Sequence, residues 1–197
     1  LVLDCRHINE HLVKFKYRYE DVSVGKKLFS ESEFLFTFDL KSAYHYVEIF
    51  EGHRTFLGFA WESYGKNMYF VFNVLAFGLA TAGFIFSKLL RVVIKYIRSM
   101  GHKVITFLDD GIGGHAVFKK ALQVSSYVQQ LLFKLGFLFA DEKCSWLPSK
   151  NATWLGYNWN MATNTLHATL DRISRLENAI DSMVFQLKGY KIKCISV

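Results

Sequence analysis

The sequence has little proline and little cysteine, and each shortage narrows the class of protein. A single proline, Pro148, occurs in 197 residues, which argues against a proline-rich linker or a polyproline ligand. The three cysteines, Cys5, Cys144 and Cys194, are far apart and form no Cys-x-x-Cys pair. A disulfide framework and a cysteine-based zinc site are therefore not expected. We expect a reduced, intracellular protein, in either the cytoplasm or the nucleus.

The sequence also lacks an initiating methionine and a charged leader followed by an apolar segment. It begins Leu-Val-Leu-Asp-Cys-Arg, so no targeting peptide is visible. We expect a fragment of a longer protein.

One run, residues 69–86, carries no charged side chain and is close to the lower length limit of a membrane helix. Asn73, Gly78 and Gly83 interrupt this run, and its first residues favour a strand. We therefore expect a buried strand that is followed by an amphipathic helix, and no membrane partner. An integral membrane protein is the alternative.

Hydrophobic residues and positive charge are plentiful. Hydrophobic residues make up 51% of the sequence and the formal net charge is +7. The first value is ample for the core of one sizeable domain. The second indicates an acidic partner such as nucleic acid.

Three carboxylates follow short apolar runs. Asp109 and Asp110 come after Val104–Leu108, and Asp39 comes after 34–38. Adjacent like charges repel, so Asp109 and Asp110 indicate a bound cation, although Asp-Asp-Gly is also a common hairpin turn. If the two strands are neighbours in one sheet, their ends lie about 5 Å apart. Carboxylates from both strands then share divalent ions such as Mg²⁺.

The remaining periodicity predicts helices and strands in alternation. Apolar residues recur at helical spacing over 117–135 and 170–187, and Gly136 suits a helix C-terminus. Residues 137–140 are expected to form a strand and 152–159 an aromatic hairpin. This order favours an α+β fold with antiparallel hairpins around the aspartate pair.

Six short motifs, taken in order, resemble the polymerase core of reverse transcriptases, especially those of retrotransposons. They are Leu3–Asn9, Phe38–Tyr44, Asn73–Leu79, Phe107–Asp110, Gly136–Cys144 and Trp154–Tyr157. Two positions depart from the family pattern: Cys5 replaces an aromatic residue and Ala76 replaces a proline. The subfamily resembled is DIRS-like or related to long-terminal-repeat elements.

The resemblance implies a right-hand polymerase. Residues 1–160 would form interleaved fingers and palm, with a ferredoxin-like antiparallel palm sheet backed by helices. Residues 161–197 would begin the thumb. The implied activity is RNA-directed DNA synthesis, in which a primer 3′-hydroxyl attacks a deoxynucleoside triphosphate on an RNA or DNA template. Oligomeric state is not implied.

The resemblance also implies the catalytic residues. Asp39 and Asp109 would bridge two Mg²⁺ ions, with Mn²⁺ as a substitute, and the backbone carbonyl of Leu40 would face a metal. Asp110 would complete the site or supply outer charge. Lys143 would protonate the departing pyrophosphate, and a solvated turn lysine is the alternative.

Further residues would hold the substrates. Tyr44 would be the steric gate against ribonucleotides, or else an aromatic residue packed beneath the sheet. The other residues implied for nucleotide binding are Phe77, Gly78 and Arg6. The residues implied for the primer grip, with hairpin core packing as the alternative, are Trp154, Leu155, Gly156 and Tyr157. Three alternating basic residues face template phosphates or solvent: Lys14, Lys16 and Arg18.

A second function remains open, namely a catalytically inactive or domesticated nucleic-acid-binding remnant of such a polymerase. Ala76 and the glycine-rich Gly111–Gly114 segment are compatible with decay, because glycine weakens a strand. The intact Asp39, Asp109 and Asp110 favour the enzyme.

Overall fold

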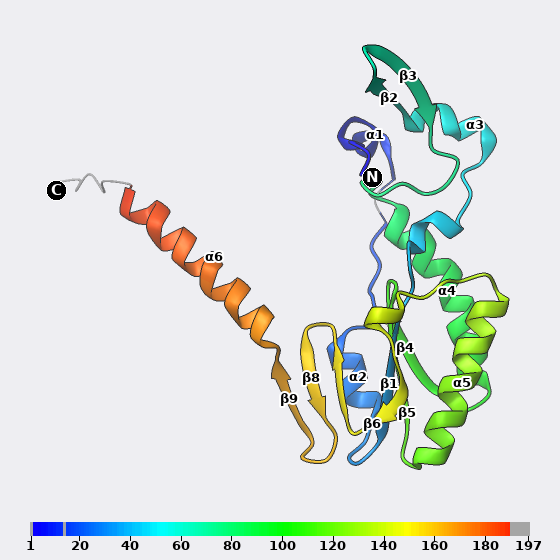
Figure 1. Ribbon diagram of the computed structural model, residues 1–197, viewed down its shortest axis with the longest axis vertical. Helices are drawn as coiled ribbons and strands as arrows, with labels where there is room; N and C mark the ends of the chain where they lie inside the picture. Colours follow the sequence, from blue (N-terminus) through cyan, green and yellow to red (C-terminus); the bar gives the residue numbers. More distant parts are fainter. Residues whose placement is uncertain (1, 14, 190–197) are drawn as a thin grey trace.

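The computed structural model describes residues 2–13 and 15–189 and shows helices mixed with antiparallel sheets (Figure 1). The helices are α1 (Arg6–His11), α2 (Val22–Leu28), α3 (Glu51–Arg54), α4 (Ala82–Ser99), α5 (Phe118–Lys134) and α6 (Leu170–Gly189). The 3₁₀ helices are η1 (Ala43–Tyr46), η2 (Thr55–Leu57) and η3 (Asp141–Lys143). The strands are β1 (Phe34–Asp39), β2 (Gly58–Ser63), β3 (Lys66–Val71), β4 (Lys103–Phe107), β5 (Asp110–His115), β6 (Ser145–Ser149), β7 (Asn151–Trp154), β8 (Tyr157–Asn160) and β9 (Thr165–Ala168). The expected mixture of helices and antiparallel strands is confirmed.

The main sheet has the strand order β4-β5-β1-β6. We considered the case in which the strand before Asp109 lies directly beside the strand that ends at Asp39, and in the structure these two strands are not neighbours. The chain reverses at Leu108, whose φ is 55°, and β5 then inserts between β4 and β1. As a result Asp39 pairs in register with Asp110. The Asp-Asp sequence is thus a hairpin turn and also the meeting point of three carboxylates.

Two cores lie on opposite faces of this sheet because side chains of a strand alternate between faces. Phe36 and Phe38 of β1 pack with the buried faces of α4 and α5, which cover the same side of the sheet (Figure 1). Leu35 faces the other way and packs with Trp154 and Trp159 of the β7–β8 hairpin. The sheet end that carries the aspartates is therefore held from both faces.

The glycines of β5 provide space for large rings on β1. Gly111 and Gly113 are the register partners of Phe38 and Phe36, and a Cβ at either glycine would overlap the opposite ring. We considered the glycine-rich segment compatible with decay, but the structure assigns these glycines a packing role. Their small size is what lets two phenylalanines enter the core.

The expected buried strand near residue 69 was wrong. β3 is exposed along its whole length and pairs only with β2, in a hairpin that projects at the top of Figure 1. The uncharged run 69–86 is divided between β3, a connecting segment and the first turns of α4, which begins at Ala82. None of the described helices is both long and apolar enough to cross a membrane.

Residues 137–140 do not form the expected strand. Phe139 makes an isolated bridge with Leu40, and the Ala140 N–H donates to the Asp39 carbonyl at 3.0 Å. β6 occupies the place beside β1 instead, where Trp146 stacks on Phe38 with the ring planes 2° apart. Hence this segment lines only the last residues of β1.

The other expected elements are confirmed. α5 matches the helix predicted over 117–135, and Gly136 follows it with φ of 89°. β7 and β8 form the aromatic hairpin, and α6 extends away from the sheet beyond β9 (Figure 1). Residues 15–19 form no strand, so the alternation of Lys16 and Arg18 does not define a sheet face. Three parts of the expectations lie outside the described residues, namely Lys14, Cys194 and the end of the thumb segment (190–197).

Candidate active site

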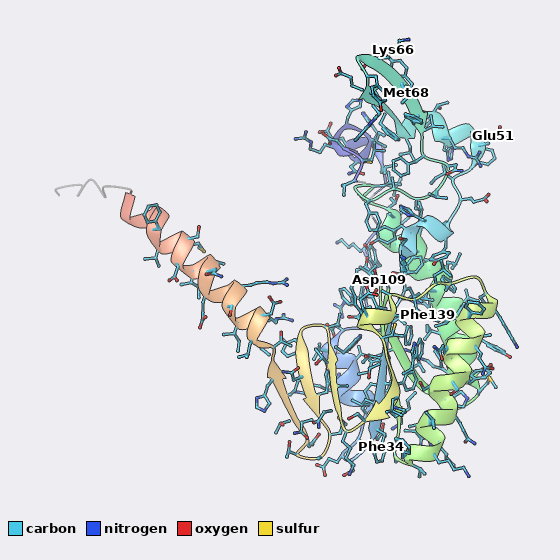
Figure 2. All side chains as sticks on the ribbon, viewed as in Figure 1. Phe34, Glu51, Lys66, Met68, Asp109 and Phe139 are labelled. Carbon is cyan, nitrogen blue, oxygen red and sulfur yellow. The ribbon has the colours of Figure 1, made fainter. Side chains whose placement is uncertain are left out.

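Three carboxylates meet at one end of the main sheet. Two belong to the neighbouring strands β1 and β5, and the third belongs to the turn between β4 and β5. Asp39 ends β1, Asp110 begins β5, and the two residues are register partners. Asp109 occupies the turn between β4 and β5, and its carbonyl accepts a hydrogen bond from the Leu40 N–H at 2.9 Å. Asp109 lies at the end of the sheet opposite to Phe34 (Figure 2). The structure thus brings together the four residues expected to bind metal.

Crowding and burial disfavour the charged forms of two of these carboxylates. Burial raises the pKa of Asp110 to about 7, and the charges of Asp39 and Asp109 add to this effect. Burial also raises the pKa of Asp109, with a smaller contribution from Asp39. The protein therefore supplies too little positive charge to balance these carboxylates, and a bound cation would supply the remainder.

Lys143 supplies the nearest positive charge. Its Nζ lies 3.5 Å from the Asp39 Oδ2, with the lysine side chain 62% exposed and that of Asp39 only 19% exposed. Lys143 belongs to η3, so it is a turn lysine as the alternative held, yet its amine reaches the carboxylate site. The exposed Lys143 amine thus lies beside the Asp39 carboxylate.

The donor chemistry of the site fits a hard divalent cation. Carboxylate oxygens are the ligands that Mg²⁺ prefers, and it keeps room for phosphate oxygens. Among the described residues, no group of three or more His, Cys, Asp and Glu side chains converges closely enough to hold a metal by itself. Asp39 and Asp109 would therefore share such an ion with other oxygen ligands.

Cys144 also contacts the site, and our sequence reasoning gave it no role. The Asp39 N–H donates to the Cys144 Sγ at 3.3 Å. Cys144 lies directly before the first residue of β6. The thiol is half-buried, and burial raises its pKa. The only signal in the sequence was its place directly after Lys143.

Tyr44 lies beside Phe77 and near the carboxylates. Its ring centroid is 4.9 Å from that of Phe77 and 5.9 Å from that of Phe86 in α4. Burial raises the pKa of Tyr44, and the charge of Asp109 raises it further. The half-buried ring thus packs on the core, as the alternative held, and also adjoins the carboxylate site.

The segment around Gly78 is held by the first motif of the chain. Gly78 has φ of 106°, and a Cβ there would overlap the Leu3 carbonyl oxygen, so glycine is required. The Asn9 side chain donates to the Gly78 carbonyl at 2.9 Å and accepts from the Ala80 N–H at 2.8 Å. Asn9 was not among the expected site residues, although it ends the first motif. It fixes the segment that carries Phe77.

Arg6 does not join the carboxylates in the part of the chain that the structure describes. It forms an ion pair with Asp4, with 2.6 Å between Nη2 and Oδ2, and its side chain is 89% exposed. Both residues lie at the start of α1 and belong to the first motif.

Residues 154–157 form the tight turn between β7 and β8. Leu155 and Gly156 have φ of 50° and 71°, values typical of a two-residue hairpin loop. Trp154 is fully buried against Trp159, with 6.0 Å between ring centroids. This residue therefore packs in the hairpin core, which was the alternative to a primer-grip role. The Leu155 backbone N–H lowers the pKa of Asp110, so this turn adjoins the site.

The fold and site define a mixed α/β protein with an acidic site at the end of an antiparallel sheet. The family model described as "Reverse transcriptase (RNA-dependent DNA polymerase)" matches residues 1–159. The chain therefore belongs to the reverse transcriptase family. No curated protein matches the sequence.

A solved structure supports the same fold. The chain is similar to the foamy viral protease-reverse transcriptase in complex with double-stranded DNA, with a TM-score of 0.72 and 20% identity over 90% of this chain. It spans 29% of the length of that solved chain. At this identity the likeness shows the fold.

Proposed function

We propose that this chain is an RNA-directed DNA polymerase that adds deoxynucleotides to a primer 3′-hydroxyl by two-metal nucleotidyl transfer. The observation that carries the proposal is the meeting of Asp39, Asp109 and Asp110 beside Tyr44, in a chain of the reverse transcriptase family. The partners of the chain are an RNA or DNA template with a primer, and deoxynucleoside triphosphates.

Asp39 and Asp109 would hold two Mg²⁺ ions, or Mn²⁺ in their place, with the Leu40 carbonyl as a further ligand. The bound ions supply activation of the attacking oxygen and stabilisation of the leaving oxygen. Asp110 lies beside the Leu155 backbone N–H, which lowers its pKa, and would contribute negative charge to the site. Lys143 donates a proton to the departing pyrophosphate from its position beside Asp39.

The nucleotide would lie against Tyr44, Phe77 and Gly78. The Tyr44 ring excludes a 2′-hydroxyl, and the bare Gly78 backbone allows close approach. Arg6 would exchange Asp4 for the triphosphate, since an exposed ion pair is worth little and is readily replaced. The 154–157 turn would hold the primer end.

We assign the main sheet to the palm and the β2–β3 hairpin to the fingers, within residues 1–160. Residues 161–197 would begin the thumb with α6. A retrotransposon of the DIRS-like or long-terminal-repeat-related type is the proposed source of such a chain, with an intracellular location. The inactive-remnant alternative loses one of its supports, because the β5 glycines are needed for packing.

Primer extension with the 197-residue chain on RNA and DNA templates, with Mg²⁺ or Mn²⁺, tests the proposal. Asp109→Asn is expected to lower the rate by about 10³-fold, equivalent to about 4 kcal/mol of activation free energy, because a metal ligand loses its charge. Asp171→Asn is the matched control, since Asp171 is an exposed residue of α6 paired with Arg175. Synthesis that survives the Asp109→Asn change refutes the mechanism. Binding of primer–template without synthesis by the unaltered chain favours the remnant.

A further inference from the structure

Helix α6 contacts the β7–β8 turn through one side chain, Arg172. The Arg172 Nη1 donates to the Leu155 carbonyl at 2.9 Å. The guanidinium carbon of Arg172 also lies 4.4 Å from the centroid of the Tyr157 ring, a distance at which a cation and an aromatic face attract. One side chain therefore holds residues on both sides of the turn.

The turn has a backbone conformation that benefits from such support. Leu155 is a non-glycine residue with φ of 50°, a region that costs free energy unless surrounding contacts enforce it. The next carbonyl, that of Gly156, accepts a hydrogen bond from the Thr169 N–H at 3.0 Å. A Cβ at Gly156 would lie 3.3 Å from the Arg172 Cδ, so the arginine is packed closely on the turn. The start of α6 thus binds both carbonyls of the turn.

The opposite side of the same turn faces the acidic site. The Leu155 backbone N–H lowers the pKa of the Asp110 carboxyl, while the Leu155 carbonyl accepts a hydrogen bond from Arg172. A change in the position of the turn therefore changes the electrostatic environment of Asp110. This arrangement links the first turn of α6 to the acidic site through a single residue.

We propose that Arg172 is a positioning residue that holds the Leu155–Gly156 turn against Asp110 and, on the proposed function, holds the primer end in line for reaction. The planar guanidinium suits both contacts, because it donates in its plane and stacks on Tyr157 with its face. A lysine has a compact ammonium group and cannot make both contacts in this way. Arg172 acts through the turn and does not itself contact the carboxylates in the described contacts.

Single-turnover primer extension by Arg172→Ala, Arg172→Lys and Arg175→Ala tests this role, with active sites titrated in each preparation. Arg175 is the matched control because it lies on the same helix and pairs with Asp171, with its side chain 79% exposed. Arg172→Ala is expected to lower the rate per active site about tenfold and to change the KM for the nucleotide less than about twofold. Arg172→Lys is expected to recover part of the rate. A normal rate per active site in Arg172→Ala, with or without a smaller active fraction, overturns the proposal.

Amide hydrogen exchange at Leu155, measured by NMR, tests the same role without requiring synthesis. Exchange at Leu155 is expected to be about tenfold faster in Arg172→Ala than in Arg175→Ala, because the turn loses the two Arg172 contacts that hold it. Equal exchange rates overturn the positioning role. If the unaltered chain makes no DNA while exchange responds as expected, the proposed function fails and the positioning of the turn stands.

Discussion

Tyr44 occupies a position where its ring takes part in packing and, on the proposed function, in nucleotide selection. Its ring lies against Phe86 of the core and against Phe77. On the proposed function, a ring packed in this way near Asp109 would be the barrier to a larger sugar.

Tyr44→Ala is expected to admit ribonucleotides, because the ring no longer occupies the space of a 2′-hydroxyl. The preference for deoxynucleotides over ribonucleotides should fall by at least about tenfold, roughly 1.4 kcal/mol. Tyr44→Phe keeps the ring and should keep the preference. Comparing kcat/KM for the two nucleotide types in primer extension measures this, and an unchanged ratio in Tyr44→Ala would refute the gate.

At the residue scale the three aspartates are not equivalent. Asp39 adjoins Lys143 and Cys144, whereas the Leu155 backbone N–H acts on the pKa of Asp110. Asp109 lies in the turn between them, half-buried. These different neighbours support separate roles, with Asp39 and Asp109 as the shared ligands and Asp110 as the residue that connects the site to the 154–157 turn.

At the scale of elements, β5 shows why a strand can contain three glycines. Phe36 and Phe38 are both fully buried in the core beneath α4 and α5, and large residues pack efficiently when their neighbours are small. The loss of strand propensity at Gly111, Gly113 and Gly114 is offset by this packing and by pairing on both sides with β1 and β4.

Gly113→Ala is expected to lower the free energy of unfolding by about 1–3 kcal/mol, because the new methyl group overlaps the Phe36 ring. Urea denaturation measures the change. Phe36→Leu shortens the facing side chain, so in the double variant the Gly113→Ala cost should shrink by about 1 kcal/mol. Strictly additive costs of the two changes would contradict direct packing between these residues.

At the scale of the whole molecule, the acidic site lies between two parts of the chain that extend into solvent. The β2–β3 hairpin projects beyond one end of the molecule, and α6 extends away from β9 (Figure 1). The Lys66–Met68 end of that hairpin is distant from the Phe34 end of the main sheet, with Asp109 between them (Figure 2). A long polymer substrate is the kind of ligand that can contact such separated parts.

The net charge of +7 predicts salt-dependent binding of primer–template. If six to ten phosphates are contacted, affinity should fall by about 10³–10⁵ between 50 and 200 mM salt, because the release of counterions into more concentrated salt gains less entropy. Fluorescence anisotropy with a labelled primer–template at several salt concentrations measures this. An affinity independent of salt would show that phosphate contacts contribute little.

The sequence by itself determined the order of the motifs, the three aspartates and the three longest helices, α4, α5 and α6. Helical periodicity identified α5 and α6, because a repeat near four residues is a local property of the chain. Aromatic residues indicated the hairpin over 152–159, which contains Leu155 and Gly156. The family resemblance was also available from these short segments.

Only the tertiary structure decided which strands are neighbours and which residues support the site. The insertion of β5 between β4 and β1, and the contacts of Cys144 and Arg172, depend on pairing between segments far apart in the sequence. The burial of Phe137 and Ala140 and the exposure of β3 depend on which elements cover them. Local propensity does not encode such long-range packing. This packing supplies the free energy that selects one strand register.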